Sequence, residues 1–255
     1  MTRNLFKPDS KLVTSVVPSP NHEARGARID ILLMHYTGMQ SAEEALARLT
    51  DRQAGVSCHY FVHEDGRIDQ LVQEARRAWH AGLSSWKGAV DINARSIGIE
   101  VVNPGHENGY RDFPDAQIEA LIALSRDVIK RHPIRRERVL AHSDVAPTRK
   151  NDPGERFPWA RLAQAGIGLW VEPAPITEGR TFSANDKGPE VEKLQKQLAR
   201  FGYEMKISAH YDDLTRTIVT AFQRHFRPAR VDGLADPSTL DTLRQIGRAS
   251  CRERV

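Results

Sequence analysis

The sequence has no long apolar run, no basic cluster and few cysteines. No segment approaches the roughly 20 apolar residues of a membrane-spanning helix, and residues 1–26 contain no apolar run of the signal-peptide type. The formal net charge is +4, spread along the chain. Because nucleic-acid-binding proteins usually show a clustered Lys/Arg face, that class is not expected. An anionic polymer stays open as a partner.

The last ten residues, "IGRASCRERV", do not continue the pattern before them. A helical pattern is expected to end near Gln245 or Ile246. We interpret residues 247–255 as a non-native tail that resembles a translated adapter sequence. Without it, the net charge falls from +4 to +2, because three arginines and one glutamate are removed. Only Cys58 then remains, which cannot form an internal disulfide and is expected to be a buried apolar residue.

Residues 1–170 alternate between strand and helix patterns. The run "RIDILLMHYT" is typical of a buried strand that ends near a histidine, and the capping box that begins at Ser41 predicts a helix. Such alternation, with one hairpin around Asp65-Gly66, predicts an α/β domain with a mixed central β-sheet flanked by helices. The expected strands are 28–37, 95–103 and 138–142, the hairpin spans 56–73, and the expected helices are 41–50, 114–132 and 158–165.

The remaining residues predict a second, smaller domain. Residues 171–186 are rich in Pro, Thr, Ser and Gly and are typical of a linker. Three helical patterns follow within residues 187–246, with prolines at the starts of two of them. We therefore expect a three-helix domain of about 60 residues, near the lower size limit for an independent core.

Polar residues at the ends of apolar strands suggest a metal site. His35 and His142 each end an apolar strand, and Glu100 lies inside a third. A charge in an apolar strand is unfavourable unless it is paired or binds a metal, and ligands collect at strand ends in α/β sheets. With Asp152, the two histidines would supply two imidazoles and a carboxylate, a set that suits zinc. The alternative is that Asp152 caps a turn and His142 only packs.

Four ordered motifs resemble a known enzyme family. "LLMHYTG", "RAWHAG", "SIGIEVVN" and "HSDVAPTRKNDPG" are similar to the N-acetylmuramoyl-L-alanine amidases of the AmpD/AmiD type, over about residues 12–170. The resemblance implies that zinc is bound by His35, His142 and Asp152. It also implies that Glu100 is the catalytic acid and base and that Lys150 stabilises the oxyanion. Residues 187–246 resemble a small peptidoglycan-binding domain.

Several further residues are candidates to line the cleft of such an enzyme. Tyr36 and Asn103 flank His35 and Glu100, and the "AWHAG" stretch offers Trp79 and His80 to a sugar ring or peptide. A tryptophan in an α/β domain can equally belong to the core. Three other residues are expected outside the site: Arg149 as a solvated loop residue, and His59 and His63 as partly exposed strand residues. The aromatic and basic stretch "FQRHF" is expected to be helix core with a solvated face.

Two function classes remain possible at this point. The first is a bacterial zinc amidase that acts on peptidoglycan or muropeptides, and the second is a non-catalytic peptidoglycan recognition module. Non-catalytic relatives typically lose a zinc ligand, and none is missing here, which favours the enzyme. If the chain is exported, it would act in the cell envelope or periplasm, and otherwise in the cytoplasm; the peptidoglycan-binding domain favours the envelope.

Overall fold

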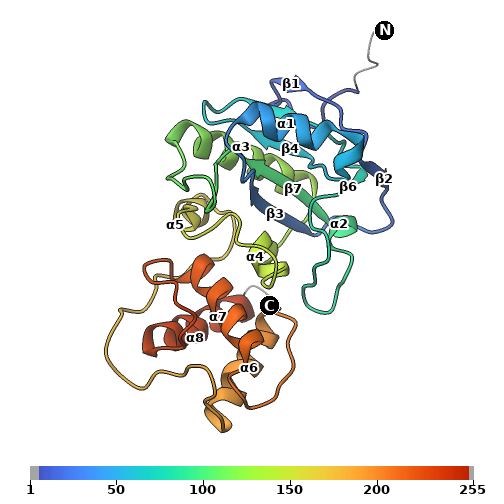
Figure 1. Ribbon diagram of the computed structural model, residues 1–255. Helices are drawn as coiled ribbons and strands as arrows, with labels where there is room; N and C mark the ends of the chain where they lie inside the picture. Colours follow the sequence, from blue (N-terminus) through green and yellow to red (C-terminus); the bar gives the residue numbers. More distant parts are fainter. Residues whose placement is uncertain (1–5, 253–255) are drawn as a thin grey trace.

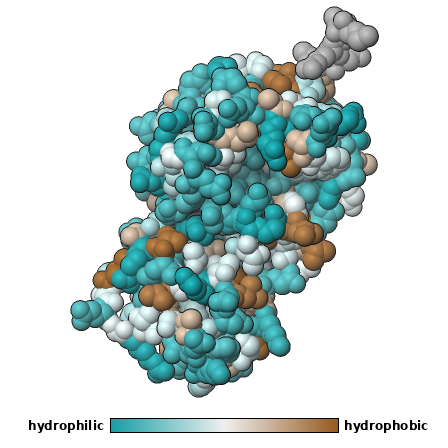
Figure 2. Space-filling view, in the orientation of Figure 1, coloured by the Kyte–Doolittle hydropathy of each residue, from teal (hydrophilic) through white to brown (hydrophobic). Residues whose placement is uncertain are grey.

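The protein consists of an α/β part and a smaller helical part that pack directly against each other (Figure 1). The computed structural model describes residues 6–252. None of the helices among these residues combines the length and the apolar character that crossing a membrane requires. The surface of the α/β part is mostly hydrophilic, whereas hydrophobic side chains are more frequent around its junction with the helical part (Figure 2).

The α/β part contains the predicted mixed sheet. Its six strands lie in the order β1-β5-β4-β7-β3-β8. β7 lies between β4 and β3 and is parallel to both, β8 is parallel to β3, and the β4–β5 hairpin is antiparallel. The strand bounds are β1 Ser15–Val16, β3 Ile31–Tyr36, β4 Tyr60–Val62, β5 Ile68–Gln70, β7 Ser96–Val101 and β8 Val139–Ala141. A separate two-stranded sheet pairs β2 His22–Ala24 with β6 Arg76–Ala78.

The two faces of the central sheet are covered by different helices. Alternate side chains of a strand point to opposite faces, and Leu32 and Met34 of β3 pack in the apolar cluster that includes α3 Asp115–Arg131. Helix α1 Ala42–Thr50 lies over the other face and packs on Phe61 of β4 (Figure 1). Ser41 caps α1 by accepting the amide hydrogen of Glu44, as predicted. His35 therefore points to the face opposite α3.

Short elements complete the α/β part. They are α2 Ile92–Arg95, α4 His142–Val145, α5 Trp159–Gln164 and the 3-10 helices Arg52–Ala54 and Arg136–Arg138. Every strand and helix predicted for this part occurs within its expected range. One detail differs, since His142 begins α4 instead of ending β8. The buried position of Cys58 is confirmed.

The expectation that His59 and His63 are partly exposed is wrong. Both side chains are buried, because each finds polar partners inside the protein. His59 Nδ1 accepts the amide hydrogen of Gly98, and the Arg25 guanidinium lies 2.8 Å from its Nε2. His63 Nε2 lies 2.8 Å from Asp69 Oδ2. Burial lowers the pKa of His59 to about 3, and the nearby positive charge of Arg25 contributes to this shift. The imidazole of His59 is therefore neutral at physiological pH.

The helical part contains the three predicted helices. They are α6 Pro189–Phe201, α7 Asp213–Phe226 and α8 Pro237–Arg252. The predicted end of the last helix near Ile246 is wrong, because α8 continues through the first residues of the suspected tail, where Ala249 packs on the core. Residues 253–255 of that tail lie outside the described residues. Residues 171–186 form no helix or strand apart from an isolated bridge between Phe182 and Ala235.

One of the apolar clusters of the core contains side chains from both parts. Trp86, from the loop before α2, is completely buried between them. Its ring lies edge-on to Phe201 and Tyr203, with centroids 5.4 and 5.1 Å apart. A Cβ atom added to Gly202 would lie 2.4 Å from the Trp86 ring, so the indole touches the backbone at this glycine. The helical part is therefore docked on the α/β part through this tryptophan.

Trp86→Ala is expected to lower the free energy of unfolding by about 3–5 kcal/mol, the range for removing a buried aromatic side chain. Denaturant unfolding measures the change. Leu83→Ala is the matched control, because Leu83 lies in the same loop with 86% of its surface exposed. That control should change stability by less than about 0.5 kcal/mol. Equal effects of the two substitutions would contradict the role given to Trp86.

Candidate metal centre

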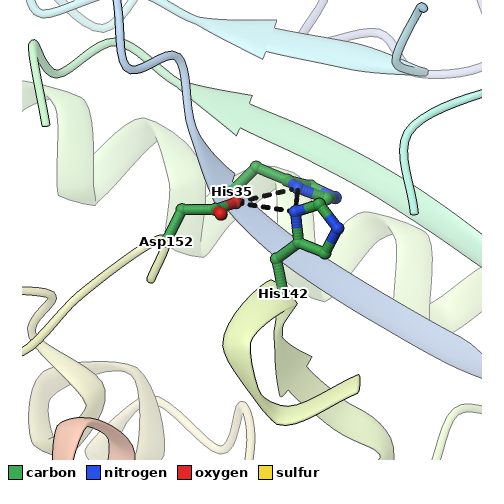
Figure 3. A group of neighbouring side chains, drawn as sticks. All are labelled: His35, His142 and Asp152. Atoms are coloured by element: carbon green, nitrogen blue, oxygen red, sulfur yellow. Dashed lines mark hydrogen bonds and ion pairs between the residues drawn. The ribbon is translucent and has the colours of Figure 1, made fainter. Parts of the chain in front are cut away.

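His35, His142 and Asp152 meet at the carboxyl ends of β3 and β8 (Figure 3). The Nδ1 atoms of His35 and His142 are 2.9 Å apart. Asp152 Oδ2 lies 3.1 Å from His35 Nδ1 and 3.0 Å from His142 Nδ1. All three side chains are buried. The structure thus brings together the three residues proposed as metal ligands, and their donor atoms converge on one point.

The surroundings of His142 set the position of its hydrogen. Its Nε2 lies 3.1 Å from the carbonyl oxygen of Ala81, which can only accept, so Nε2 carries the hydrogen in neutral His142 and Nδ1 keeps its lone pair. Arg149 also donates to this carbonyl, with a distance of 2.9 Å from Nη2. Sequence reasoning placed Arg149 in solvent; the residue is exposed, but its guanidinium braces the carbonyl that orients His142.

A chain of hydrogen bonds orients His35 in the same way. Its Nε2 lies 3.0 Å from His80 Nδ1, and His80 Nε2 lies 3.2 Å from Ser96 Oγ. Because the Ser96 hydroxyl donates to the Ile92 carbonyl, it accepts from His80 Nε2. His80 Nδ1 is therefore an acceptor, and His35 donates to it from Nε2. The lone pair of His35 Nδ1 is left facing Asp152.

The charge states of the three residues fit a bound cation. Burial, helped by the neighbouring His142, lowers the pKa of His35 to about 4, so its imidazole is neutral. A carboxyl group binds a metal ion in its ionised form, so Asp152 would contribute a carboxylate. Two nitrogen lone pairs and a carboxylate would repel one another without a positive charge between them. Such a donor set suits a divalent metal ion with room for water.

Glu100 lies beside His35 on the adjacent strand. The two residues are register partners between the parallel strands β3 and β7, so their side chains leave the same face of the sheet. Glu100 Oε2 is buried and has no hydrogen-bond partner among the described residues. Burial, together with the charge of Asp152, raises the pKa of Glu100 well above its ordinary value, against the opposing effect of Lys150. A carboxyl group with a raised pKa can exchange protons near neutral pH.

The loop that follows α4 brings Lys150 and Asp152 to the same cleft. Its backbone is tied to the helix, because Ser143 donates its amide hydrogen to the Asp152 carbonyl and Lys150 donates to that of Ala146. Lys150 is half-buried and forms no ion pair within residues 6–252. Its ammonium group is therefore available to a ligand in the cleft.

A cleft of about 320 Å³ opens over the three ligand residues. Tyr36 and Trp79, both expected there, lie in its wall. The Tyr36 hydroxyl lies 3.0 Å from His106 Nδ1, and this histidine stacks on Tyr110 with ring centroids 4.3 Å apart. Sequence reasoning missed His106, because no strand pattern or motif marks its loop. Other residues of the wall are Met39, Arg48, Ser57, Glu107 and Asn151.

Two residues expected to contact substrate have different surroundings. His80 borders the cleft, but both of its ring nitrogens are used inside the protein, by His35 and Ser96. Asn103 is buried away from the cleft wall; its amide donates to the Arg111 carbonyl and accepts from Gly105. The polar atoms of His80 and Asn103 are therefore hydrogen-bonded to other protein groups, whereas they were expected to contact substrate. Of the two, only His80 borders the cleft.

Gly98→Ala is expected to weaken metal binding by about 10- to 100-fold, as for other changes behind a metal ligand. The added methyl group would lie 2.4 Å from His80 Nδ1 and would push away the imidazole that orients His35. Competition with a chelator measures the affinity. Gly26→Ala is the control, because nothing lies within 4 Å of its added Cβ. Unchanged affinity in Gly98→Ala would show that His80 does not hold His35.

Family comparisons agree with this arrangement. Residues 25–155 match the N-acetylmuramoyl-L-alanine amidase family, and residues 187–243 match a peptidoglycan-binding domain family. The chain is 42% identical to N-acetylmuramoyl-L-alanine amidase AmiD of Escherichia coli over 233 residues, which cover 85% of this chain and 82% of that protein.

Solved structures give the same relationship. A complex of E. coli AmiD with the substrate anhydro-N-acetylmuramic acid-L-Ala-D-gamma-Glu-L-Lys matches with a TM-score of 0.73 and 39% identity, covering 91% of this chain and 92% of that one. AmpDh3 from Pseudomonas aeruginosa in complex with anhydromuramic pentapeptide matches with a TM-score of 0.70 and 30% identity, covering 86% and 91%. Together with the mixed sheet and the cluster of His35, His142 and Asp152, these matches show that the chain belongs to the N-acetylmuramoyl-L-alanine amidase family of enzymes.

Proposed function

We propose that this chain uses zinc to hydrolyse the amide between the lactyl group of N-acetylmuramic acid and L-alanine in peptidoglycan or muropeptides. The observation that carries the proposal is the convergence of His35, His142 and Asp152 in one cleft with Glu100 and Lys150. A non-catalytic recognition module would not require this complete set. The substrates named for the related AmiD and AmpDh3 complexes support the choice of bond.

Each reacting residue has a role that its surroundings allow. Bound zinc would polarise the scissile carbonyl and lower the pKa of a water molecule. Glu100 takes the proton of the attacking water on its carboxylate and then transfers it to the leaving nitrogen of L-alanine, because its raised pKa suits both transfers. Lys150 donates to the oxyanion that develops on the carbonyl oxygen.

The other four candidate residues have two kinds of role, since two line the cleft and two support neighbouring groups. Tyr36 and Trp79 form the cleft wall and offer apolar surface to the sugar or the stem peptide. His80 holds His35 in the tautomer that leaves Nδ1 free for the metal. Asn103 braces the loop beside Tyr36 through its contacts with Gly105 and Arg111.

We further propose that residues 1–170 form the zinc amidase domain and residues 187–246 a peptidoglycan-binding domain, joined by residues 171–186. The family match of residues 187–243 supports this division. A domain that binds the polymer raises the local concentration of scissile bonds. This favours action on the wall or its fragments in the cell envelope.

Product analysis tests the proposal. The protein is incubated with purified sacculi and, separately, with anhydro-muropeptides, each with and without a chelator, and the products are identified by mass. Release of free stem peptides that stops with chelator supports the proposed reaction. Binding without cleavage, by protein that contains one zinc per chain, would overturn it. The ratio of the two rates identifies the preferred substrate pool.

A further inference from the structure

Helix α4 carries a buried carboxylate that the proposed reaction does not use. Asp144 lies two residues after the metal ligand His142, and its side chain is completely buried. A buried carboxylate is tolerated only when hydrogen-bond donors surround it. One donor is local, since the amide nitrogen of Ala141 lies 2.8 Å from Asp144 Oδ2.

The other two donors to Asp144 come from the helical domain. The Tyr203 hydroxyl lies 2.6 Å from Asp144 Oδ1, and His225 Nδ1 lies 2.6 Å from Oδ2. Burial, together with the charge of Asp144, raises the pKa of Tyr203 well above its usual value, so its hydroxyl keeps the hydrogen that it donates. The helical domain therefore supplies two of the three donors to a carboxylate on the helix that begins with His142.

Packing fixes both donors in place. The His225 ring lies between Trp159 of α5 and Phe226 of α7, with ring centroids 3.8 Å from each. Tyr203 packs against Trp86 with ring centroids 5.1 Å apart. His225 is thus an interface residue, and the expectation that "FQRHF" contributes only helix core and a solvated face is wrong for this histidine.

The position of α4 bears on two of the three metal ligands. His142 is its first residue, and Ser143 donates its amide hydrogen to the Asp152 carbonyl at 3.0 Å. A shift of this four-residue helix would therefore move the imidazole of His142 and loosen the backbone of Asp152 together. A difference of about 1 Å at a catalytic group is enough to affect turnover strongly.

We propose that the helical domain is a structural support of the metal centre, in which Tyr203 and His225 act through Asp144 to fix α4 and its ligand. They are positioning residues, since neither belongs to the cluster of donor atoms. This inference rests on the proposed metal-dependent function. It adds that the helical domain is needed even for small soluble substrates, which a domain used only to bind the wall would not be.

The test uses the full chain with Tyr203→Phe, His225→Phe and the double substitution. Both changes keep an aromatic ring and remove a donor to Asp144. Tyr211→Phe is the matched control, because Tyr211 is equally buried and donates to the Gly233 carbonyl inside the helical domain. Three experiments are made. Chelator competition gives the affinity for Co²⁺ or Zn²⁺, the Co²⁺-loaded protein gives a visible absorption spectrum, and kinetics on a soluble anhydro-muropeptide give kcat and KM.

Each single substitution is expected to weaken metal binding and lower kcat by about tenfold, the lower end of the range for groups behind a metal ligand. The double substitution should weaken metal binding and lower kcat more than either single substitution. It should also change the Co²⁺ spectrum, while KM changes little. Tyr211→Phe should leave metal affinity and spectrum unchanged.

Wild-type metal affinity and kcat in both single variants would overturn the inference. If the double variant fails to fold, the single variants still decide the matter, because Tyr203→Phe removes one oxygen atom. Failure of the proposed function looks different: the wild-type protein would then show no chelator-sensitive cleavage, while the comparison of metal affinities would still report on Asp144.

Discussion

Glu100→Gln is expected to lower the rate of stem-peptide release by about 10²- to 10⁴-fold, the usual contribution of a general acid and base. Glutamine has nearly the same shape but cannot take up and return a proton. Glu100 does not belong to the cluster of donor atoms that we propose to bind the metal, so the variant should keep its metal. The measurement pairs the rate on a soluble anhydro-muropeptide with the metal content of the same preparation.

Glu107→Gln is the matched control for this experiment. Glu107 lies in the wall of the same cleft but is exposed. Its substitution also replaces a carboxyl group by an amide, but at a position outside the group of proposed reacting residues. Its rate should stay within about threefold of the wild type, as for a surface substitution of about 0.5 kcal/mol. If Glu100→Gln kept the rate of this control with its metal bound, Glu100 would not be the proton carrier.

His35→Ala is expected to remove the metal and to reduce activity to that of the chelator-treated protein. Loss of one imidazole leaves a two-residue site, and a catalytic zinc site normally has three protein ligands. The substitution also removes the hydrogen bond between His35 Nε2 and His80 Nδ1. Elemental analysis after dialysis reports the metal content, and the rate on soluble substrate is measured in parallel.

The control for the ligand substitution is His106→Ala. His106 lies in the same cleft and contacts Tyr36 and Glu155, but it is not among the clustered donor atoms. It should keep one metal ion per chain. Retention of metal in His35→Ala together with loss in His106→Ala would place the centre elsewhere in the cleft.

Much of the α/β part is readable from local sequence patterns. The apolar strands that end near His35 and His142, and the acid inside the strand of Glu100, follow from apolar runs of three to six residues. Pairing of β3 with β7 and β8 then brings these residues to one edge. Which carboxylate completes the centre was not decided by spacing; the resemblance of the whole loop around Asp152 suggested it.

The surroundings of the other histidines could not be read in this way. His59 and His80 are buried because of partners that are distant in the sequence, such as Arg25 for His59 and His35 for His80. Alternation along a strand gives the direction of a side chain but not the polar group that meets it. The sequence therefore located His80 near the site but not its role behind His35.

Docking of the helical domain is the largest feature that the sequence did not predict. Residues 171–186 have the composition of a linker, which suggests a loose tether. The structure instead shows direct contacts between the two parts. Trp86 packs on Phe201, and Asp144 is hydrogen-bonded to Tyr203 and His225. Sequence separations of 59 and 81 residues divide Asp144 from its two partners, and no local pattern spans them.

The central claim is that one metal ion held by His35, His142 and Asp152 drives amide hydrolysis. The most direct test is to titrate chelator-treated protein with zinc while measuring stem-peptide release and bound metal. We expect activity to rise in proportion to bound zinc and to level off at one ion per chain, and Asp152→Ala to show neither effect. Full activity in protein shown to be free of metal, or normal zinc activation of Asp152→Ala, would contradict the account.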